Sequence, residues 1–161
     1  MKPLDRILAG LVDAERVPSL AIAGLAMDSR RLAPGDAFLA LAGTRRHGME
    51  YAESALRAGA TVVLHDGVAP VPEAIRERCV EVSGLAAELH TLCARYWDDP
   101  VSGLDLTAVT GTNGKSSVAW LLAQALNGGM IGTLGIGRPN ALAVASHTTP
   151  DMPSMNSFKF F

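Results

Sequence analysis

The sequence predicts an α/β fold in two parts. Apolar runs of strand length alternate with segments of helical periodicity along the 161 residues. Turn residues cluster at Asp98-Asp99-Pro100, which predicts a boundary at about residues 98–103. A glycine-rich turn between a strand-like run and a helix-like run opens the second part. We therefore expect a small N-terminal α/β domain at residues 1–100 and the beginning of a second α/β domain at residues 101–161.

Helices and strands of the first part follow from its apolar spacing. Helical periodicity predicts helices over residues 3–14, 51–59 and 85–98. Pro3 begins the first of these helices, Gly59 closes the second, and Ser83 caps the third. Short apolar runs bounded by turn residues predict strands over residues 20–26, 37–42, 61–65 and 79–82. This alternation is typical of a sheet covered by helices.

The second part begins with a predicted strand over residues 104–110 and a helix over residues 115–126. Two further strands are predicted over residues 130–134 and 141–145. The last ten residues, 152–161, have no helical period, and three of the chain's four phenylalanines fall in the last four positions. This change of composition indicates a frame change, a truncation or an appended segment.

Composition excludes several classes of partner. A net charge of −2 provides no basic surface for nucleic acid or anionic membrane, and no apolar run approaches the length of a membrane span. The N-terminus does not resemble a signal peptide. Cys79 and Cys93 are isolated and fit a reducing compartment. We expect a cytoplasmic monomer.

The turn that opens the second part has the composition of a phosphate-binding loop. Its residues are Gly111, Thr112, Asn113, Gly114, Lys115, Ser116 and Ser117. Glycines let the backbone approach a phosphate, lysine neutralises the outer phosphates, and the Ser116 hydroxyl suits Mg²⁺. Val109 occupies the position where the strict Walker A pattern has its first glycine. An ordinary strand-turn-helix corner with a solvated lysine has the same order of residues.

This loop, Thr110-Gly111-Thr112-Asn113-Gly114-Lys115-Ser116, resembles that of the Mur ligases, which are ATP-dependent amino-acid-adding enzymes of peptidoglycan synthesis. Two further stretches resemble the MurE type. One is Met27-Asp28-Ser29-Arg30, followed by the run from Pro34 to Leu41, and the other is His147-Thr148-Thr149-Pro150-Asp151. The resemblance covers about residues 3–151. It implies a substrate-binding N-terminal domain followed by a P-loop ATPase domain.

The resemblance also implies roles for individual residues. The uridine end of UDP-MurNAc-dipeptide would bind Met27, Ser29, Thr44, Arg45 and Arg46, and the muramoyl peptide would bind His147, Thr148 and Thr149. The loop would bind ATP, with Lys115 catalytic and Ser116 on Mg²⁺. The reaction implied is addition of the third amino acid, L-lysine or meso-diaminopimelate, to UDP-MurNAc-L-Ala-D-Glu. The later parts of the family architecture are missing here, so we expect this chain to be inactive.

Simpler roles remain open for these residues. Arg45 and Arg46 could be solvated surface charges, Ser29 a turn cap, and the Thr-Thr-Pro-Asp segment an N-cap. We interpret His47, His65 and His90 as structural or surface residues. Two other functions also remain open: a different P-loop hydrolase or kinase, and a stand-alone nucleotide-binding module.

Overall fold

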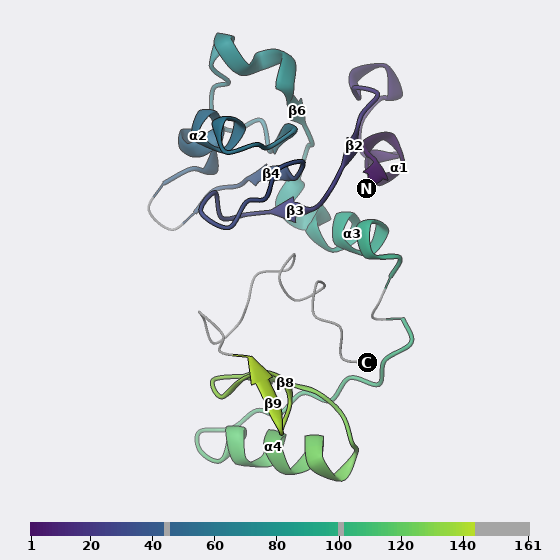
Figure 1. The fold of residues 1–161 in the computed structure, drawn as a ribbon, viewed down its shortest axis with the longest axis vertical. Coiled ribbons are helices and arrows are strands. Elements are labelled where there is room, and N and C mark those ends of the chain that lie inside the picture. The colour runs from purple at the N-terminus through teal and green to yellow at the C-terminus, as the bar shows by residue number, and fades with distance from the viewer. Residues whose placement is uncertain (44–45, 100–101, 144–161) are drawn as a thin grey trace. The chain divides into compact units, whose positions relative to one another are not determined.

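The computed structural model describes residues 1–43, 46–99 and 102–143. The chain divides into two compact units, Met1–Asp99 and Pro100–Phe161 (Figure 1). This division falls within the segment 98–103 where turn residues cluster. Each unit has its own sheet and at least one helix.

The first unit is built on a four-stranded parallel sheet. Its strands are β3 (Leu25–Ala26), β4 (Ala37–Ala40), β5 (Val62–His65) and β6 (Cys79–Glu81), and they lie side by side in that order. Phe38 pairs with Val63, and Val63 in turn pairs with Cys79. Every residue of β4 and β5 is buried. Parallel strands covered on both faces become continuous apolar runs, as the sequence has here.

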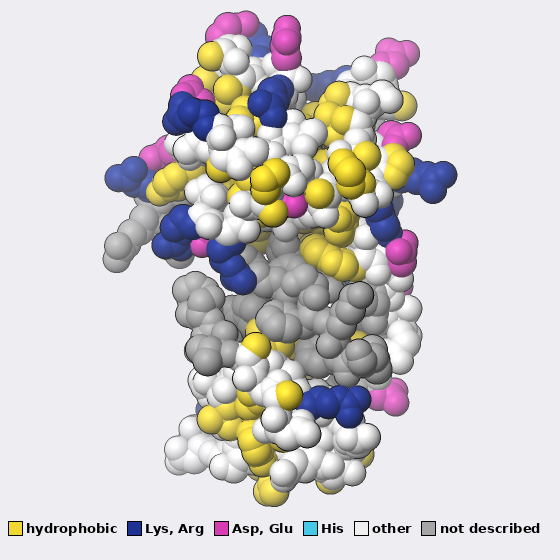
Figure 2. Space-filling view, in the orientation of Figure 1, with side chains coloured by type: hydrophobic (Ala, Val, Ile, Leu, Met, Phe, Trp, Pro, Cys, Tyr) yellow, Lys and Arg dark blue, Asp and Glu magenta, His cyan; other side chains and the backbone are white. Residues whose placement is uncertain are grey.

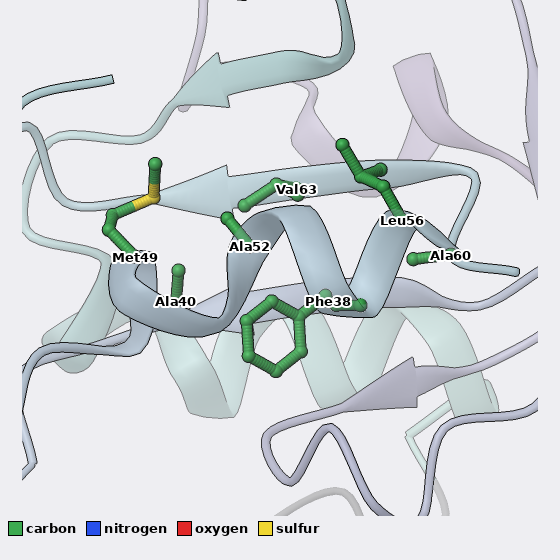
Figure 3. Close-up of a cluster of buried hydrophobic side chains, with 8 residues drawn as sticks. Phe38, Ala40, Met49, Ala52, Leu56, Ala60 and Val63 are labelled. Atoms are coloured by element: carbon green, nitrogen blue, oxygen red, sulfur yellow. The ribbon is translucent and has the colours of Figure 1, made fainter. Parts of the chain in front are cut away.

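Helices cover the two faces of this sheet. A 3-10 turn η2 (Gly48–Tyr51) leads into α2 (Ala52–Arg57) on one face, and α3 (Leu85–Trp97) lies on the other (Figures 1 and 3). Figure 3 shows α2 lying across β4 and β5. The buried cluster between them consists of Phe38, Ala40, Met49, Ala52, Ala55, Leu56, Ala60 and Val63. Short side chains on α2 let the helix approach the strands closely.

The two ends of the first unit are joined by polar contacts. The short strand β1 (Lys2–Pro3) pairs with β2 (Ala21–Ile22), and α1 (Leu4–Leu8) follows it. Arg95 Nη1, on α3, donates to the carbonyls of Ile7 and Ala9 at 2.8 and 2.7 Å. Lys2 Nζ lies 2.5 Å from Asp98 Oδ1. Residues more than 85 positions apart in the sequence therefore meet.

The predicted helix over residues 3–14 is wrong beyond Leu8. The chain turns at Gly10, whose φ is +73°, and the amides of Leu11 and Val12 both donate to the Leu8 carbonyl. A 3-10 turn, η1 (Ala14–Arg16), follows. Another 3-10 helix, η3 (Glu73–Arg78), precedes β6. Leu11 has the apolar spacing that a helix would continue, but the chain is not helical at this position.

Two further predictions for the first unit are corrected. The predicted strand over residues 20–26 is divided between two sheets, because Gly24 abuts the Asp36 carboxylate and the chain changes partners there. The predicted cap Ser83 does not cap α3. Gly84, with φ of +68°, occupies the N-cap position, and no side chain caps this helix.

The second unit contains α4 (Lys115–Ala125) and a three-stranded antiparallel sheet. The strands are β7 (Met130–Gly132), β8 (Gly135–Arg138) and β9 (Ala141–Ala143), in sequence order. The sequence pattern missed β8, because Gly135 and Gly137 interrupt the alternation of a strand. A Cβ at either glycine would lie 2.6 Å from a carbonyl oxygen of β9.

The predicted strand over residues 104–110 is wrong. Within the described part of the chain this segment pairs with no strand, and most of it is exposed. Its alternating sequence suits a sheet, but a strand requires a hydrogen-bonded neighbour.

Charges are mixed on the face that Figure 2 shows. Lysine and arginine side chains of the first unit lie among aspartate and glutamate side chains instead of gathering in one patch. No helix in the described part of the chain is long and apolar enough to cross a membrane.

Candidate functional site

Polar residues gather at the carboxyl edge of the parallel sheet. Residues 27–30 follow β3, the segment that contains Arg46 follows β4, and Asp66 follows β5. Since β3 and β4 are parallel neighbours, the Met27–Arg30 turn and Arg46 belong to the same edge. Ligands of open parallel sheets bind at this edge. Thr44 and Arg45 lie outside the described residues.

The turn after β3 is organised by an ion pair. Arg30 Nε and Nη2 lie 2.9 and 2.7 Å from the two carboxylate oxygens of Asp28. The hydrogen bond from the Arg30 side chain is the main reason that the pKa of Asp28 lies below its usual value. Arg30 is exposed, whereas Met27 and Ser29 are half-buried. A guanidinium is thus oriented at the edge, although an anionic ligand would compete with Asp28 for it.

Backbone hydrogen bonds join the two ends of the segment after β4. The Gly43 amide donates to the Arg46 carbonyl at 3.0 Å, and the Gly48 amide donates to the Leu41 carbonyl at 2.7 Å. A Cβ on Gly48 would lie 2.7 Å from the Leu41 nitrogen, so this close approach requires glycine. The Arg46 side chain is exposed and lies 3.5 Å from Glu50 Oε2. These hydrogen bonds hold the backbone of the segment, and the Arg46 side chain lies in solvent.

His47 and Asp66 form a contact that sequence reasoning missed. His47 Nε2 lies 3.1 and 3.2 Å from the two carboxylate oxygens of Asp66. Both side chains are largely buried, with 16% and 13% exposed. Asp66 directly follows a buried strand, as Met27–Arg30 does. The place of Asp66 directly after a predicted strand was the sequence feature that could have identified it.

His65 lies beside this pair and is buried. Its Nδ1 accepts a hydrogen bond from the Gly67 amide at 3.1 Å. Burial lowers the pKa of His65, since the charged form loses water. Its packing and local hydrogen bond give it a structural role.

The predicted phosphate loop has the backbone conformation that its glycines allow. Gly111 and Gly114 have φ of +150° and +77°, and a Cβ at either position would meet no atom closer than 3.5 Å. Backbone conformation, not crowding, therefore requires these glycines. Lys115 begins α4, and its Nζ donates to the carbonyls of Gly111 and Thr112 at 2.6 and 3.4 Å. Thr112, Asn113 and Ser117 are exposed.

Ser116 contacts a second hydroxyl group. Its Oγ lies 3.0 Å from Oγ1 of Thr133, which directly follows β7. Sequence reasoning did not select Thr133, because the predicted strand over residues 130–134 included it, whereas β7 ends at Gly132. Among the described residues no group of three or more His, Cys, Asp or Glu could hold a metal ion. The Ser116–Thr133 contact brings two hydroxyl oxygens together at the start of α4. His147, Thr148 and Thr149 lie outside the described residues.

Comparison with known proteins identifies the class to which this fold and this sheet edge belong. Residues 21–97 match the family described as "Mur ligase family, catalytic domain". They include the whole parallel sheet and the residues at its carboxyl edge. Residues 21–97 are thus a Mur ligase family domain.

Two curated relatives carry the same name. The UDP-N-acetylmuramoyl-L-alanyl-D-glutamate--2,6-diaminopimelate ligase of Pseudomonas aeruginosa is 44% identical over 145 residues, covering 86% of this chain and 29% of the relative. The enzyme of the same name from Alkalilimnicola ehrlichii is 42% identical over 159 residues, covering 90% and 31%. The chain thus spans about three tenths of the length of these relatives.

Solved structures agree with this placement. A structure of a UDP-N-acetylmuramoyl-L-alanyl-D-glutamate--2,6-diaminopimelate ligase superposes with a TM-score of 0.63 at 27% identity, covering 97% of this chain and 32% of that one. MurF from Acinetobacter baumannii superposes with a TM-score of 0.58 at 26% identity, covering 77% and 26%. The α/β architecture is that of Mur ligases.

Proposed function

We propose that this chain is part of a MurE-type ligase, which adds 2,6-diaminopimelate to UDP-N-acetylmuramoyl-L-alanyl-D-glutamate in peptidoglycan synthesis. The observation that carries the proposal is 44% identity, over most of the chain, to a relative named for these substrates. Because the chain spans about three tenths of that relative, the complete reaction belongs to a full-length protein. Within that protein, this chain would contribute residues that bind the two nucleotides.

The first unit would bind the uridine diphosphate end of the substrate. Met27, Ser29 and Arg46 belong to one sheet edge, and Thr44 and Arg45 adjoin Arg46 in the sequence. Arginine can donate two parallel hydrogen bonds to a phosphate. His147, Thr148 and Thr149 would bind the muramoyl peptide, as the family resemblance implies.

The second unit would bind ATP and Mg²⁺ through residues 111–117. ATP, when bound, supplies the phosphoryl group that activates the carboxylate of the muramoyl peptide. Lys115 would exchange its bonds to the Gly111 and Thr112 carbonyls for phosphate oxygens. There it neutralises charge, which is the main contribution of a protein to phosphoryl transfer. Ser116 would offer its hydroxyl to Mg²⁺.

Titration calorimetry of the 161-residue chain with UDP-N-acetylmuramoyl-L-alanyl-D-glutamate tests the proposed binding. We expect weak binding that Arg46→Ala reduces about tenfold, as loss of one charge-assisted hydrogen bond predicts. Arg57→Ala is the matched control, because Arg57 also pairs with a glutamate four residues away but lies on α2. A folded chain that does not bind this substrate would contradict the proposal.

A further inference from the structure

The imidazole of His47 bridges two segments of the first unit. Its Nδ1 accepts a hydrogen bond from the Met49 amide at 3.1 Å, and its Nε2 contacts both carboxylate oxygens of Asp66. A ring nitrogen that accepts an N–H bond carries no proton. The ring proton therefore lies on Nε2 and is donated to Asp66, which fixes the tautomer and the orientation of the ring.

Asp66 is itself held firmly. Its Oδ1 accepts a hydrogen bond from the Val68 amide at 3.1 Å, and it follows β5, in which every residue is buried. Burial alone would raise the pKa of Asp66, but the hydrogen bonds from Val68 and His47 lower it overall. The carboxylate is therefore a charged and fixed acceptor for the His47 ring.

The bridge lies directly beside Arg46 in the chain. His47 follows Arg46 directly and is the N-cap of η2. The His47 amide donates to Glu50 Oε1 at 3.3 Å, while Glu50 Oε2 lies 3.5 Å from Arg46 Nη1. The Arg46 carbonyl is held by the Gly43 amide. Arg46 is thus an exposed cation on a backbone that is fixed on both sides.

We propose that Asp66 is a positioning residue: through His47 it holds Arg46 at the carboxyl edge of the sheet in the place where a diphosphate binds. This role rests on the proposed function, because it assigns Arg46 to the diphosphate. A bridge that only stabilised the unit would leave the affinity of a folded chain for diphosphate unchanged.

Two substitutions weaken or remove the bridge and keep the N-cap. Asp66→Asn removes the charge of the acceptor at nearly constant volume. His47→Asn retains a side-chain acceptor for the Met49 amide, since asparagine is a favoured N-cap, but it is too short to reach Asp66. His90→Asn is the control, because His90 is an exposed histidine on α3.

Calorimetric titration of the 161-residue chain with UDP measures the effect, with thermal melts to verify that each variant is folded. We expect Asp66→Asn and His47→Asn each to weaken UDP binding about tenfold, and the double variant to lose no more than either alone. His90→Asn should bind as the unmodified chain does. In an Arg46→Ala background, Asp66→Asn should have no further effect, because Asp66 acts through Arg46.

Two results overturn the positioning role alone: undiminished UDP binding by Asp66→Asn, or a loss of the same size in the Arg46→Ala background. If the unmodified chain is folded and binds no UDP, the proposed function of this edge fails and the positioning role fails with it. Nitrogen-15 NMR of the His47 ring adds a separate check. A proton on Nδ1 instead of Nε2 would contradict the bridge itself.

Discussion

Neighbouring residues at the end of β5 have opposite electrostatic environments. His65 is buried, and the loss of water favours its neutral form. Asp66 receives hydrogen bonds from Val68 and His47, which favour its charged form. Glu81, opposite His65 in the sheet register, favours the charged histidine and only partly offsets burial. Two adjacent positions thus respond to pH in different ranges.

The first prediction concerns His65. Its pKa in the folded chain lies below the ordinary value of 6.5, so below pH 6.5 the unfolded chain binds more protons. The free energy of unfolding should therefore fall as the pH falls from 6.5 toward the lowered pKa. His65→Asn, which keeps an acceptor for the Gly67 amide, should flatten this part of the profile. Urea denaturation at pH values from 7 to 5 measures it.

The exposed His90 supplies the control for this experiment. His90→Asn makes the same substitution at an exposed position on α3. Parallel profiles for His65→Asn and the unmodified chain would show that His65 does not contribute.

At the scale of elements, α3 and α4 differ in what they cover. α3 buries Leu85, Leu92 and Cys93, whereas α4 buries only Ala123. The side chain of Leu121 on α4 is 63% exposed. Since most helical stability in proteins comes from packing, α4 is held mainly by its own backbone and by limited contact with β7.

The second prediction compares two leucines in these helices. Leu92→Ala on α3 removes a fully buried side chain and should lower the free energy of unfolding of the first unit by about 2–5 kcal/mol. Leu121→Ala on α4 should change stability by less than about 0.5 kcal/mol, as exposed substitutions do. Chemical denaturation followed by circular dichroism measures both variants. A cost at Leu121 similar to that at Leu92 would show that α4 is packed.

Local sequence signals predicted those elements whose stabilising contacts are themselves local or apolar. The strands over residues 37–42 and 61–65 correspond to β4 and β5, because burial on both faces produces apolar runs. The helix over residues 115–126 corresponds to α4, because its start follows a glycine turn. The strand predicted over residues 104–110 was wrong because a strand forms only where a neighbouring strand pairs with it, and a local pattern does not show that neighbour.

The candidate sites also divide into features that local sequence predicts and features that depend on distant segments. The order of glycines and lysine predicted the turn before α4, whose role as a phosphate loop stays a prediction, and the Met27–Arg30 turn followed from its place after a strand. Neither the Ser116–Thr133 contact nor the His47–Asp66 contact was predicted. Each joins segments 17 or 19 residues apart whose meeting depends on strand order. That order is a property of the folded sheet and not of a local pattern.

At the scale of the whole molecule, the two units differ in how completely they are packed. The first unit has a sheet covered on both faces, and the second leaves Leu106, Val118, Leu121 and Leu126 exposed. The loop that carries the predicted ATP-binding residues belongs to the less packed unit.

The third prediction follows for hydrogen exchange. Amides of residues 104–134 should exchange faster than those of residues 3–98, and Mg-ATP should not slow them in this chain, because α4 lacks the packing that would hold the loop rigid. Mass spectrometry with and without Mg-ATP measures both effects. Slow exchange over residues 104–134 that slows further with Mg-ATP would show a preformed loop.

The fourth prediction concerns the complete reaction. The chain spans 29% of the Pseudomonas aeruginosa relative, so most of that enzyme's residues have no counterpart here. We expect no ATP-dependent formation of UDP-N-acetylmuramoyl-tripeptide by the purified 161-residue chain, measured by chromatography of the nucleotide products. Detectable tripeptide would show that these residues suffice for catalysis.

The contacts between the ends of the first unit determine when it can fold during synthesis. α1 also lies beside β1, but it gains its contacts with α3 only when Arg95 has left the ribosome, because Arg95 binds the Ile7 and Ala9 carbonyls. Until then the nascent chain exposes Leu4, Ile7 and Leu8, all fully buried in the finished unit. These turns are translated before the rest of the unit and are among the last to be covered, so a nascent chain halted before Arg95 would leave this apolar segment exposed.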